Sequence, residues 1–385
     1  MNGSPDWHTD AFPELRPERP WVMQEMIAAQ PALVEALLST PPAGVPAAAV
    51  MLSDALARHQ HVTVCGCGTS EHAAHGIAAM LAAAVGPDRS GLVRARPAFT
   101  AAQDPTPGVC VAISHDGGTH ATGLALRAAQ YTGARTVAIT QRPDGAVARE
   151  AELVLITPLH DDSWCHTVAY TSALAVGATI AGRLGHFAAD PAAARALLTR
   201  VIGCADAAAI AQRLADRRVV LCAGPEPDLA TARELALKIA EATHIPTLAL
   251  ELETVLHGQL AAHEPTDAII LVAIAPAGDQ ARVTRRTTDV ARAAGTIGLR
   301  VTGLLSDAYD QALGSDLTPD RRLVTQLPDT ELLHDRLAGL LAGAGALQTL
   351  TLELANKRDT NPDLIRREQA PYRQAAQAAE GSDDW

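Results

Sequence analysis

HVTVCGCGTS, residues 61–70, is the stretch that decides the fold. The apolar run 62–65 predicts a buried strand, the glycines that follow predict a tight turn, and the Ala-rich segment 71–85 predicts a helix. The same pattern recurs, with predicted strands at 108–114, 135–140 and 153–157 and a predicted helix at 120–132. Strands that alternate with helices in this way indicate a parallel, doubly wound sheet of the α/β class.

The second half of the chain repeats this order. Val62 aligns with Val219, and GARTVAIT from residue 133 aligns with GLRVTGLL from residue 298, which indicates an internal duplication. Predicted strands lie at 219–224, 247–252, 268–276, 299–305 and 323–328, and predicted helices at 229–243 and 281–294. We therefore expect an N-terminal arm and helix over 1–45, a first α/β domain over 46–200, a second over 201–350, and a tail over 351–385 whose last ten residues or so are disordered.

Composition and charge exclude several classes of partner. The 385 residues carry a net charge of -12, and lysines and arginines form no run longer than two, so the chain repels nucleic acid. No uncharged apolar run approaches the roughly 18 to 20 residues of a bilayer-spanning helix, and the start MNGSPDWHTD is not a signal peptide. We expect a cytoplasmic protein without a membrane partner.

The six cysteines lack the spacing of a zinc site and are expected to be reduced core residues.

Two turns place hydroxyl groups where ligands bind in open parallel sheets, outside the carboxyl ends of the strands. They comprise Gly68, Thr69 and Ser70 after the first strand, and Ser114, Gly117 and Thr119 after the next. Either turn alone is explained by simple helix N-capping. Two such turns in successive units predict a cradle for a polyol or a phosphate.

The second half offers a charged helix face and a histidine. Glu234, Lys238 and Glu241 share one face of the predicted helix 229–243, either as a solvated stripe or as functional groups. His257 in LHGQL follows the next strand, and a lone histidine is more often structural than catalytic. GPEPD, which occupies the turn equivalent to the first cradle, lacks donors and would repel anions, so this second cradle is expected to be vestigial.

GCGTS, ISHDGGT, ELALKIAEATHIP and HGQLA, in this order on a duplicated α/β chain, resemble the sugar isomerase (SIS) domains of glucosamine-6-phosphate synthase. The same family includes glucosamine-6-phosphate deaminases and fructoselysine-phosphate deglycases built from two SIS domains. The resemblance covers roughly residues 20 to 330. It implies two flavodoxin-like SIS domains in tandem and no cofactor or metal.

The resemblance also implies roles for individual residues. The two hydroxyl turns would hold the sugar phosphate, together with His115 and Asp116 of the second turn and with Thr167 in the loop DDSWCHTVAYT. Glu241 would move a proton between C1 and C2 of the open-chain sugar.

Two further residues complete the implied active site. Lys238 would stabilise oxygen atoms of the substrate beside Glu241. His257, supplied by a neighbouring subunit, would open the sugar ring. The implied assembly is therefore a homodimer with a shared active site and a small-molecule sugar or sugar phosphate as ligand.

The sequence departs from the family pattern in four ways. No glutaminase domain is expected, because the chain has no room for one before its first α/β unit. Asp116 stands where a serine is usual in the phosphate turn, and Val168 stands where lysine is common. The tail offers Arg366 and Arg367 in place of the family's lysine. The last three changes make the site less suited to strongly anionic ligands.

Three functions follow from the resemblance. The first is an aldose-ketose isomerase of a sugar phosphate or amino sugar that works through an enediol. The second is an amino-sugar-phosphate deaminase or Amadori-type deglycase, and the third is a non-catalytic sugar-binding regulator. A metal role for His115, His120, His160 and His166 in two facing loops is less favoured than hydrogen bonding or solvent contact, because their spacing matches no metal motif.

Overall fold

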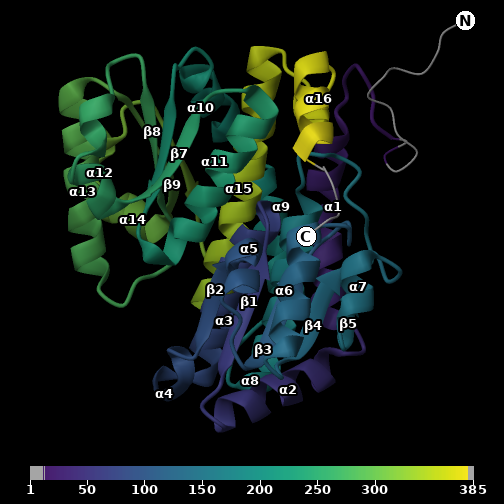
Figure 1. The fold of residues 1–385 in the computed structure, drawn as a ribbon. Helices are drawn as coiled ribbons and strands as arrows, with labels where there is room; N and C mark the ends of the chain where they lie inside the picture. Colours follow the sequence, from purple (N-terminus) through teal and green to yellow (C-terminus); the bar gives the residue numbers. More distant parts are fainter. Residues whose placement is uncertain (1–11, 13, 380–385) are drawn as a thin grey trace, which may run out of the picture.

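The computed structural model describes residue 12 and residues 14–379, which form two five-stranded parallel sheets (Figure 1). The first has the order β2-β1-β3-β4-β5 and the second the order β10-β9-β8-β6-β7. Numbered within its own half, the second sheet reads 5-4-3-1-2, which is the order of the first sheet read backwards. The predicted doubly wound folds in tandem are therefore confirmed, and the repeated strand order supports the duplication.

The strands follow the predicted segments closely. They are β1 (His61–Gly66), β2 (Val93–Pro97), β3 (Gly108–Ile113), β4 (Arg135–Thr140), β5 (Leu153–Ile156), β6 (Val220–Gly224), β7 (Thr247–Glu251), β8 (Ala268–Ala273), β9 (Arg300–Ser306) and β10 (Arg322–Thr325). The sequence analysis missed only β2. Its sequence VRARP has no apolar run, because this edge strand is half-buried along most of its length.

Helices occupy most of the remaining chain. In the first half they are α1 (Val22–Ser39), α2 (Val45–Ala57), α3 (Thr69–Val85), α4 (Pro87–Ser90), α5 (Ala98–Gln103), α6 (His120–Tyr131), α7 (Ala146–Glu150), α8 (Val168–Leu184), α9 (Pro191–Ile202) and α10 (Asp206–Leu214). In the second half they are α11 (Leu229–Thr243), α12 (Leu252–Leu256), α13 (Gln280–Ile297), α14 (Asp307–Ala312), α15 (Asp335–Arg358) and α16 (Ala370–Ala379).

Alternation of side chains along each strand gives the first sheet two different faces. Val64, Val111 and Ile139 point into the large core shared with α1, α2, α3 and α8. Cys65 and Ala112 point the other way, into a smaller core with α5 and α6. Small side chains on this second face allow α5 and α6 to lie close to the sheet. Both faces of the sheet are therefore covered, as a parallel sheet requires.

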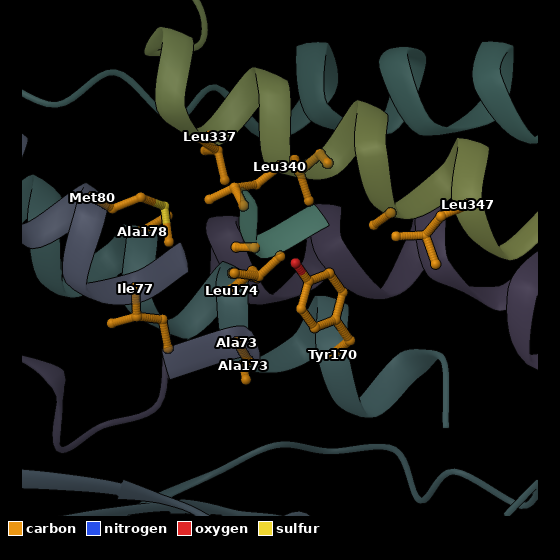
Figure 2. Packing of buried hydrophobic residues seen from close by; sticks show 14 of the residues in the cluster. Ala73, Ile77, Met80, Tyr170, Ala173, Leu174, Ala178, Leu337, Leu340 and Leu347 are labelled. Carbon is orange, nitrogen blue, oxygen red and sulfur yellow. The ribbon is translucent and has the colours of Figure 1, made fainter. Parts of the chain in front are cut away.

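A layer of helices joins the two halves into one core. The largest hydrophobic cluster contains residues of α1, α3 and α8 from the first half and of α11 and α15 from the second. Figure 2 shows part of it, where Ile77 and Leu174 lie below Leu337 and Leu340 of α15. This shared layer fixes the first half against the second.

α15 was not predicted as a separate helix. It is long and apolar enough to cross a membrane by length and composition alone, but 94% of its most apolar window is buried inside the protein. The predicted domain boundary at residue 350 falls within α15, and the boundary at residue 200 falls within α9. Both helices belong to the central helix layer that is shared by the two halves, so neither boundary coincides with a loop between domains.

Part of the C-terminal segment that was expected to be disordered is helical, because residues 376–379 form the last turn of α16. The remaining residues of that segment, 380–385, lie outside the described residues.

Close packing of α3 against α8 depends on glycine. A Cβ atom on Gly177 would lie 2.5 Å from Cγ1 of Ile77. We expect Gly177→Ala to lower the free energy of unfolding by about 1–3 kcal/mol, because the overpacked helices must separate. Chemical denaturation measures this change.

Gly182→Ala in the same helix is the matched control. A Cβ atom there would lie 3.6 Å from the nearest atom, an ordinary contact, so the substitution should be neutral or stabilising by up to about 1 kcal/mol. Equal stability of the two variants would show that α3 and α8 are not packed this closely.

Candidate active site

The first hydroxyl turn lies at the carboxyl end of β1, beside the point where the strand order reverses between β1 and β3. Gly68 adopts a φ of 56°, a left-handed backbone that favours glycine, and α3 begins at the next residue. A Cβ atom on Gly66 would lie 2.6 Å from the carbonyl carbon of Ser70, so this turn is too tight for a side chain. The buried Thr69 donates its hydroxyl to Oε1 of Glu234 at 3.1 Å.

The second hydroxyl turn follows β3 and is tied to β4. Ser114 donates its hydroxyl to Oγ1 of Thr119 at 3.1 Å, and Gly117 adopts a φ of 67°. The carbonyl of His115 accepts from the Thr140 hydroxyl at 3.1 Å and from the backbone N–H of Gln141 at 3.0 Å. Both turns predicted from the sequence therefore lie at the same edge of the sheet, next to its switch point.

α11 brings its charged face to the first turn. Nζ of Lys238 lies 2.6 Å from Oε2 of Glu241 and 3.7 Å from Oε1 of Glu234. The side chain of Glu241 is 24% exposed, whereas those of Glu234 and Lys238 are almost fully buried. The alternative of a solvated surface stripe is therefore excluded. Burial acts to lower the pKa of Lys238, but the charges of Glu241 and Glu234 outweigh it and raise the pKa above its ordinary value.

Glu234 connects the two halves of the chain. Its Oε2 lies 2.7 Å from Nδ1 of His72 on α3, and its Oε1 accepts from Thr69. The sequence analysis placed Glu234 on the functional face but did not assign it or His72 to the site. His72 follows Thr69 by three residues, so the helical spacing alone could have shown that both face the same way.

The loop before α8 contacts the second hydroxyl turn. The buried Asp161 accepts from the backbone N–H groups of Thr167 and Ala169 at the start of α8, and its own N–H donates to Nε2 of His115 at 2.9 Å. Thr167, predicted to bind substrate, is buried, and its hydroxyl has no hydrogen-bond partner within the described part of the chain. Burial raises the pKa of Asp161 to about 7.

Three histidines gather around Asp116, whose side chain is 43% exposed. Nε2 of His160 lies 3.6 Å from one carboxylate oxygen, and Nε2 of His166 lies 3.6 Å from the other. The ring of His115 lies 5.8 Å from that of His160 and 5.7 Å from that of His166. The two loops therefore face one another as expected. Among residue 12 and residues 14–379, no group of three or more His, Cys, Asp or Glu side chains could hold a metal ion.

The C-terminal tail packs beside this loop. Asp363 accepts from the N–H groups of Val22 and Met23 at the start of α1, and its carbonyl accepts from the N–H of Trp164 at 3.2 Å. The guanidinium of Arg367 lies 4.7 Å from the centre of the Trp164 ring. The tail thus places Arg367 beside the loop that precedes α8, in the part of the chain where the family resemblance implies a lysine.

His257 does not meet the other candidate residues within one chain. Its side chain is 76% exposed, and its Nε2 lies 3.3 Å from Oε2 of Glu253. Figure 1 places the neighbouring helix α12 at the outer side of the second sheet, away from β1 and α3. The role of His257 in a neighbouring active site stays a prediction.

The equivalent cradle in the second half is filled by the protein itself. The buried carboxylate of Asp228, in the turn after β6, accepts from the N–H groups of Ile274 and Ala275 at 2.9 and 3.0 Å. These amides follow β8, at the second sheet's own switch point. An internal carboxylate therefore occupies the place of an external anion, which supports the expectation of a vestigial cradle.

Comparisons with known proteins agree with this architecture. Residues 55–181, which lie within the first α/β unit, match the SIS domain family model. The chain is similar to the glutamine–fructose-6-phosphate aminotransferases [isomerizing] of Symbiobacterium thermophilum (32% identity over 203 residues, 49% of this chain and 33% of the relative) and Streptomyces coelicolor (26% over 274 residues, 66% and 42%). The alignments span 33% and 42% of the length of these curated relatives. The resemblance to the SIS sugar isomerase family is confirmed.

Solved structures share the whole fold. The C-terminal domain of glucosamine-fructose-6-phosphate aminotransferase from Francisella tularensis superposes with a TM-score of 0.74 at 18% identity, covering 90% of this chain and 98% of that one. Tagatose-6-phosphate ketose/aldose isomerase from Escherichia coli gives 0.70 at 18% identity, covering 91% and 97%. Glucosamine-6-phosphate deaminase from Thermotoga maritima gives 0.60 at 17% identity, covering 89% and 96%. At these identities the likeness shows a common fold.

Asp228 is expected to make stability depend on pH. Burial raises its pKa from 3.8 to about 7, so the folded chain keeps a proton that the unfolded chain releases above about pH 4. The free energy of unfolding should therefore fall as pH rises from about 4 to about 7. Asp228→Asn should remove the contribution of about one proton to this slope. The amide oxygen still accepts hydrogen bonds from the loop N–H groups, but the side chain does not titrate. Urea titrations at a series of pH values measure the slope.

Asp144→Asn is the matched control for this experiment. Asp144 is exposed in the loop after β4, so its substitution should leave the slope unchanged. An unaltered slope in Asp228→Asn would show that Asp228 titrates in the folded chain as it does in the unfolded chain.

Proposed function

We propose that this chain is a cofactor-independent aldose-ketose isomerase of a sugar phosphate or amino sugar, which transfers a proton through an enediol. The observation that carries the proposal is the contact between Lys238 and Glu241 at 2.6 Å on a helix face joined to the first hydroxyl turn. A carboxylate and an ammonium group held together beside a hydroxyl-lined turn are the groups that this reaction requires.

Glu241 is the base in this proposal. Its partly exposed carboxylate takes the proton from C2 of the open-chain aldose and returns it to C1, while the hydroxyl proton passes from O2 to O1, so that atoms and charge balance. Lys238 remains protonated because neighbouring carboxylates raise its pKa, and its charge stabilises the enediolate oxygens. Glu234 lies 3.7 Å from the ammonium group of Lys238 and positions it, while also contacting Thr69 and His72 of the first half.

His257 opens the sugar ring in this proposal, and it acts from a second copy of the chain. Its exposed imidazole, at the outer side of the second half, is accessible to a partner's crevice. A cyclic symmetric dimer would place each His257 in the other subunit's site, so that one interface completes both sites. This arrangement supports the homodimer proposal.

A deaminase or deglycase is the second candidate, and Asp116 is the observation that favours it. Its partly exposed carboxylate in the second turn suits a substrate nitrogen better than a phosphate. Ammonia or amine release would distinguish this outcome from simple isomerisation. The proton transfer by Glu241 is common to both reactions.

Replacement of the base should abolish proton transfer. We expect Glu241→Gln to slow deuterium incorporation at C1 and C2 in heavy water by about 10²- to 10⁴-fold, because the amide cannot accept the proton. Fructose 6-phosphate, glucosamine 6-phosphate and their unphosphorylated forms are the substrates to test by NMR. Glu331→Gln, at an exposed position remote from the crevice, should leave the rate unchanged. Full exchange by Glu241→Gln would remove Glu241 from its assigned role.

A shared active site predicts complementation between two inactive variants. Glu241→Gln and His257→Asn should each be inactive in ring opening and isomerisation of a cyclic substrate. When the two chains are unfolded together and refolded as a mixture, about half the dimers are mixed and each mixed dimer has one intact site, so about a quarter of the activity should return. If the mixture remains inactive while each variant still forms dimers, His257 does not act across subunits.

A further inference from the structure

We propose that the second turn binds the ammonium group of an unphosphorylated amino sugar, with Asp116 as the counter-charge. The inference rests on the proposed function only in that the same crevice holds the sugar. It narrows the substrate class from sugar phosphates and amino sugars together to amino sugars without phosphate at this turn.

The carboxylate of Asp116 is free to accept from a ligand. The two histidine nitrogens that face it lie at 3.6 Å, beyond the length of about 3.2 Å that an N–H···O hydrogen bond requires. The side chain is 43% exposed at the carboxyl end of β3, next to the switch point. A ligand at this turn can therefore bind the partly exposed carboxylate without displacing a protein hydrogen bond to it.

His160 lies between two carboxylates. Its Nδ1 lies 3.0 Å from Oδ1 of Asp162, and its Nε2 lies 3.6 Å from Oδ1 of Asp116. The two oxygens of Asp116 can accept hydrogen bonds from two of the three donors of an ammonium group.

The other two histidines add no positive charge to this turn. Burial lowers the pKa of His115 to about 3, and burial together with the nearby His115 and Lys238 lowers the pKa of His166 well below its ordinary value. Both rings are therefore neutral near pH 7. A phosphate at this turn would meet the carboxylate of Asp116 with no charge on His115 or His166 to balance it.

Two of the nearby cations are placed for other partners, because Lys238 contacts Glu241 and Arg367 lies over the Trp164 ring. Burial raises the pKa of Asp116, and the charges of His160 and of Arg142, which is exposed after β4, act in the opposite direction. Position 168, where the family often has lysine, is the buried Val168. The partly exposed carboxylate of Asp116 is the feature of this turn that favours a cationic ligand.

Calorimetric titration with four sugars tests the inference: glucosamine, glucose, glucosamine 6-phosphate and glucose 6-phosphate. We expect the wild-type chain to bind glucosamine at least about tenfold more tightly than glucose, and to gain no affinity from the phosphate. Asp116→Asn should reduce the glucosamine affinity about tenfold and leave the glucose affinity unchanged, because only the charged ligand loses its counter-charge. Asp116→Ser should strengthen binding of both phosphates.

Controls separate local binding from folding and from catalysis. Asp144→Asn, an exposed carboxylate in a neighbouring loop, should bind all four sugars as the wild type does, and thermal unfolding should show that every variant is folded. The inference is overturned if the wild-type chain binds either phosphate tenfold more tightly than glucosamine, if Asp116→Asn weakens glucose and glucosamine equally, or if glucosamine does not bind at millimolar concentration.

The deuterium-exchange assay tells the two proposals apart. Asp116-dependent binding of glucosamine without exchange at carbon would contradict the isomerase proposal and leave the ammonium site standing. Glu241-dependent exchange confined to sugar phosphates would contradict the ammonium site and leave the isomerase proposal standing.

Discussion

The pairing of Lys238 with Glu234 and Glu241 is the interaction on which the rest of the site depends. Charges removed from water are stable only when they pair with one another and with further polar groups. Glu234 meets this requirement by reaching across to Thr69 and His72 in the other half of the chain. The charges that would perform the chemistry therefore also hold α11 against the first hydroxyl turn, so the crevice and its proposed base form together.

The central helix layer makes that contact possible. Aromatic residues are only 3% of the chain, and small residues at the helix crossings allow backbones to approach closely. A Cβ atom on Gly343 of α15 would lie 2.6 Å from Thr231 of α11, and one on Gly76 of α3 would lie 2.7 Å from Leu174 of α8. Because the interior is close-packed, α11 has little freedom to shift relative to α3. Short polar contacts across the two halves need such a rigid frame.

Each of the two α/β halves has a turn that could hold a ligand, and a carboxylate lies in each turn: Asp116 in the first half and Asp228 in the second. In the second half, the carboxylate of Asp228 accepts the amides that an external anion would use. In the first half, Asp116 stands in the turn but points to imidazole rings at 3.6 Å, so it remains available to a ligand. The carboxylate of Asp228 occupies its own cradle, and we propose that the carboxylate of Asp116 changes the charge of the ligand that its turn selects.

The sequence by itself determined the succession of strands, turns and helices along the chain. Alternating faces, tight glycine turns and helix starts are local properties, so nine of the ten strands among the described residues, and both hydroxyl turns, were predictable from segments such as 61–70. It also placed Glu241 and Lys238 on one helix face. Only the tertiary structure decided that Glu234 meets His72, that Asp116 meets His160 and His166, and that β2 pairs at the sheet edge. These contacts join segments far apart in sequence, and the packing of whole helices and loops sets their distances, which no local pattern encodes.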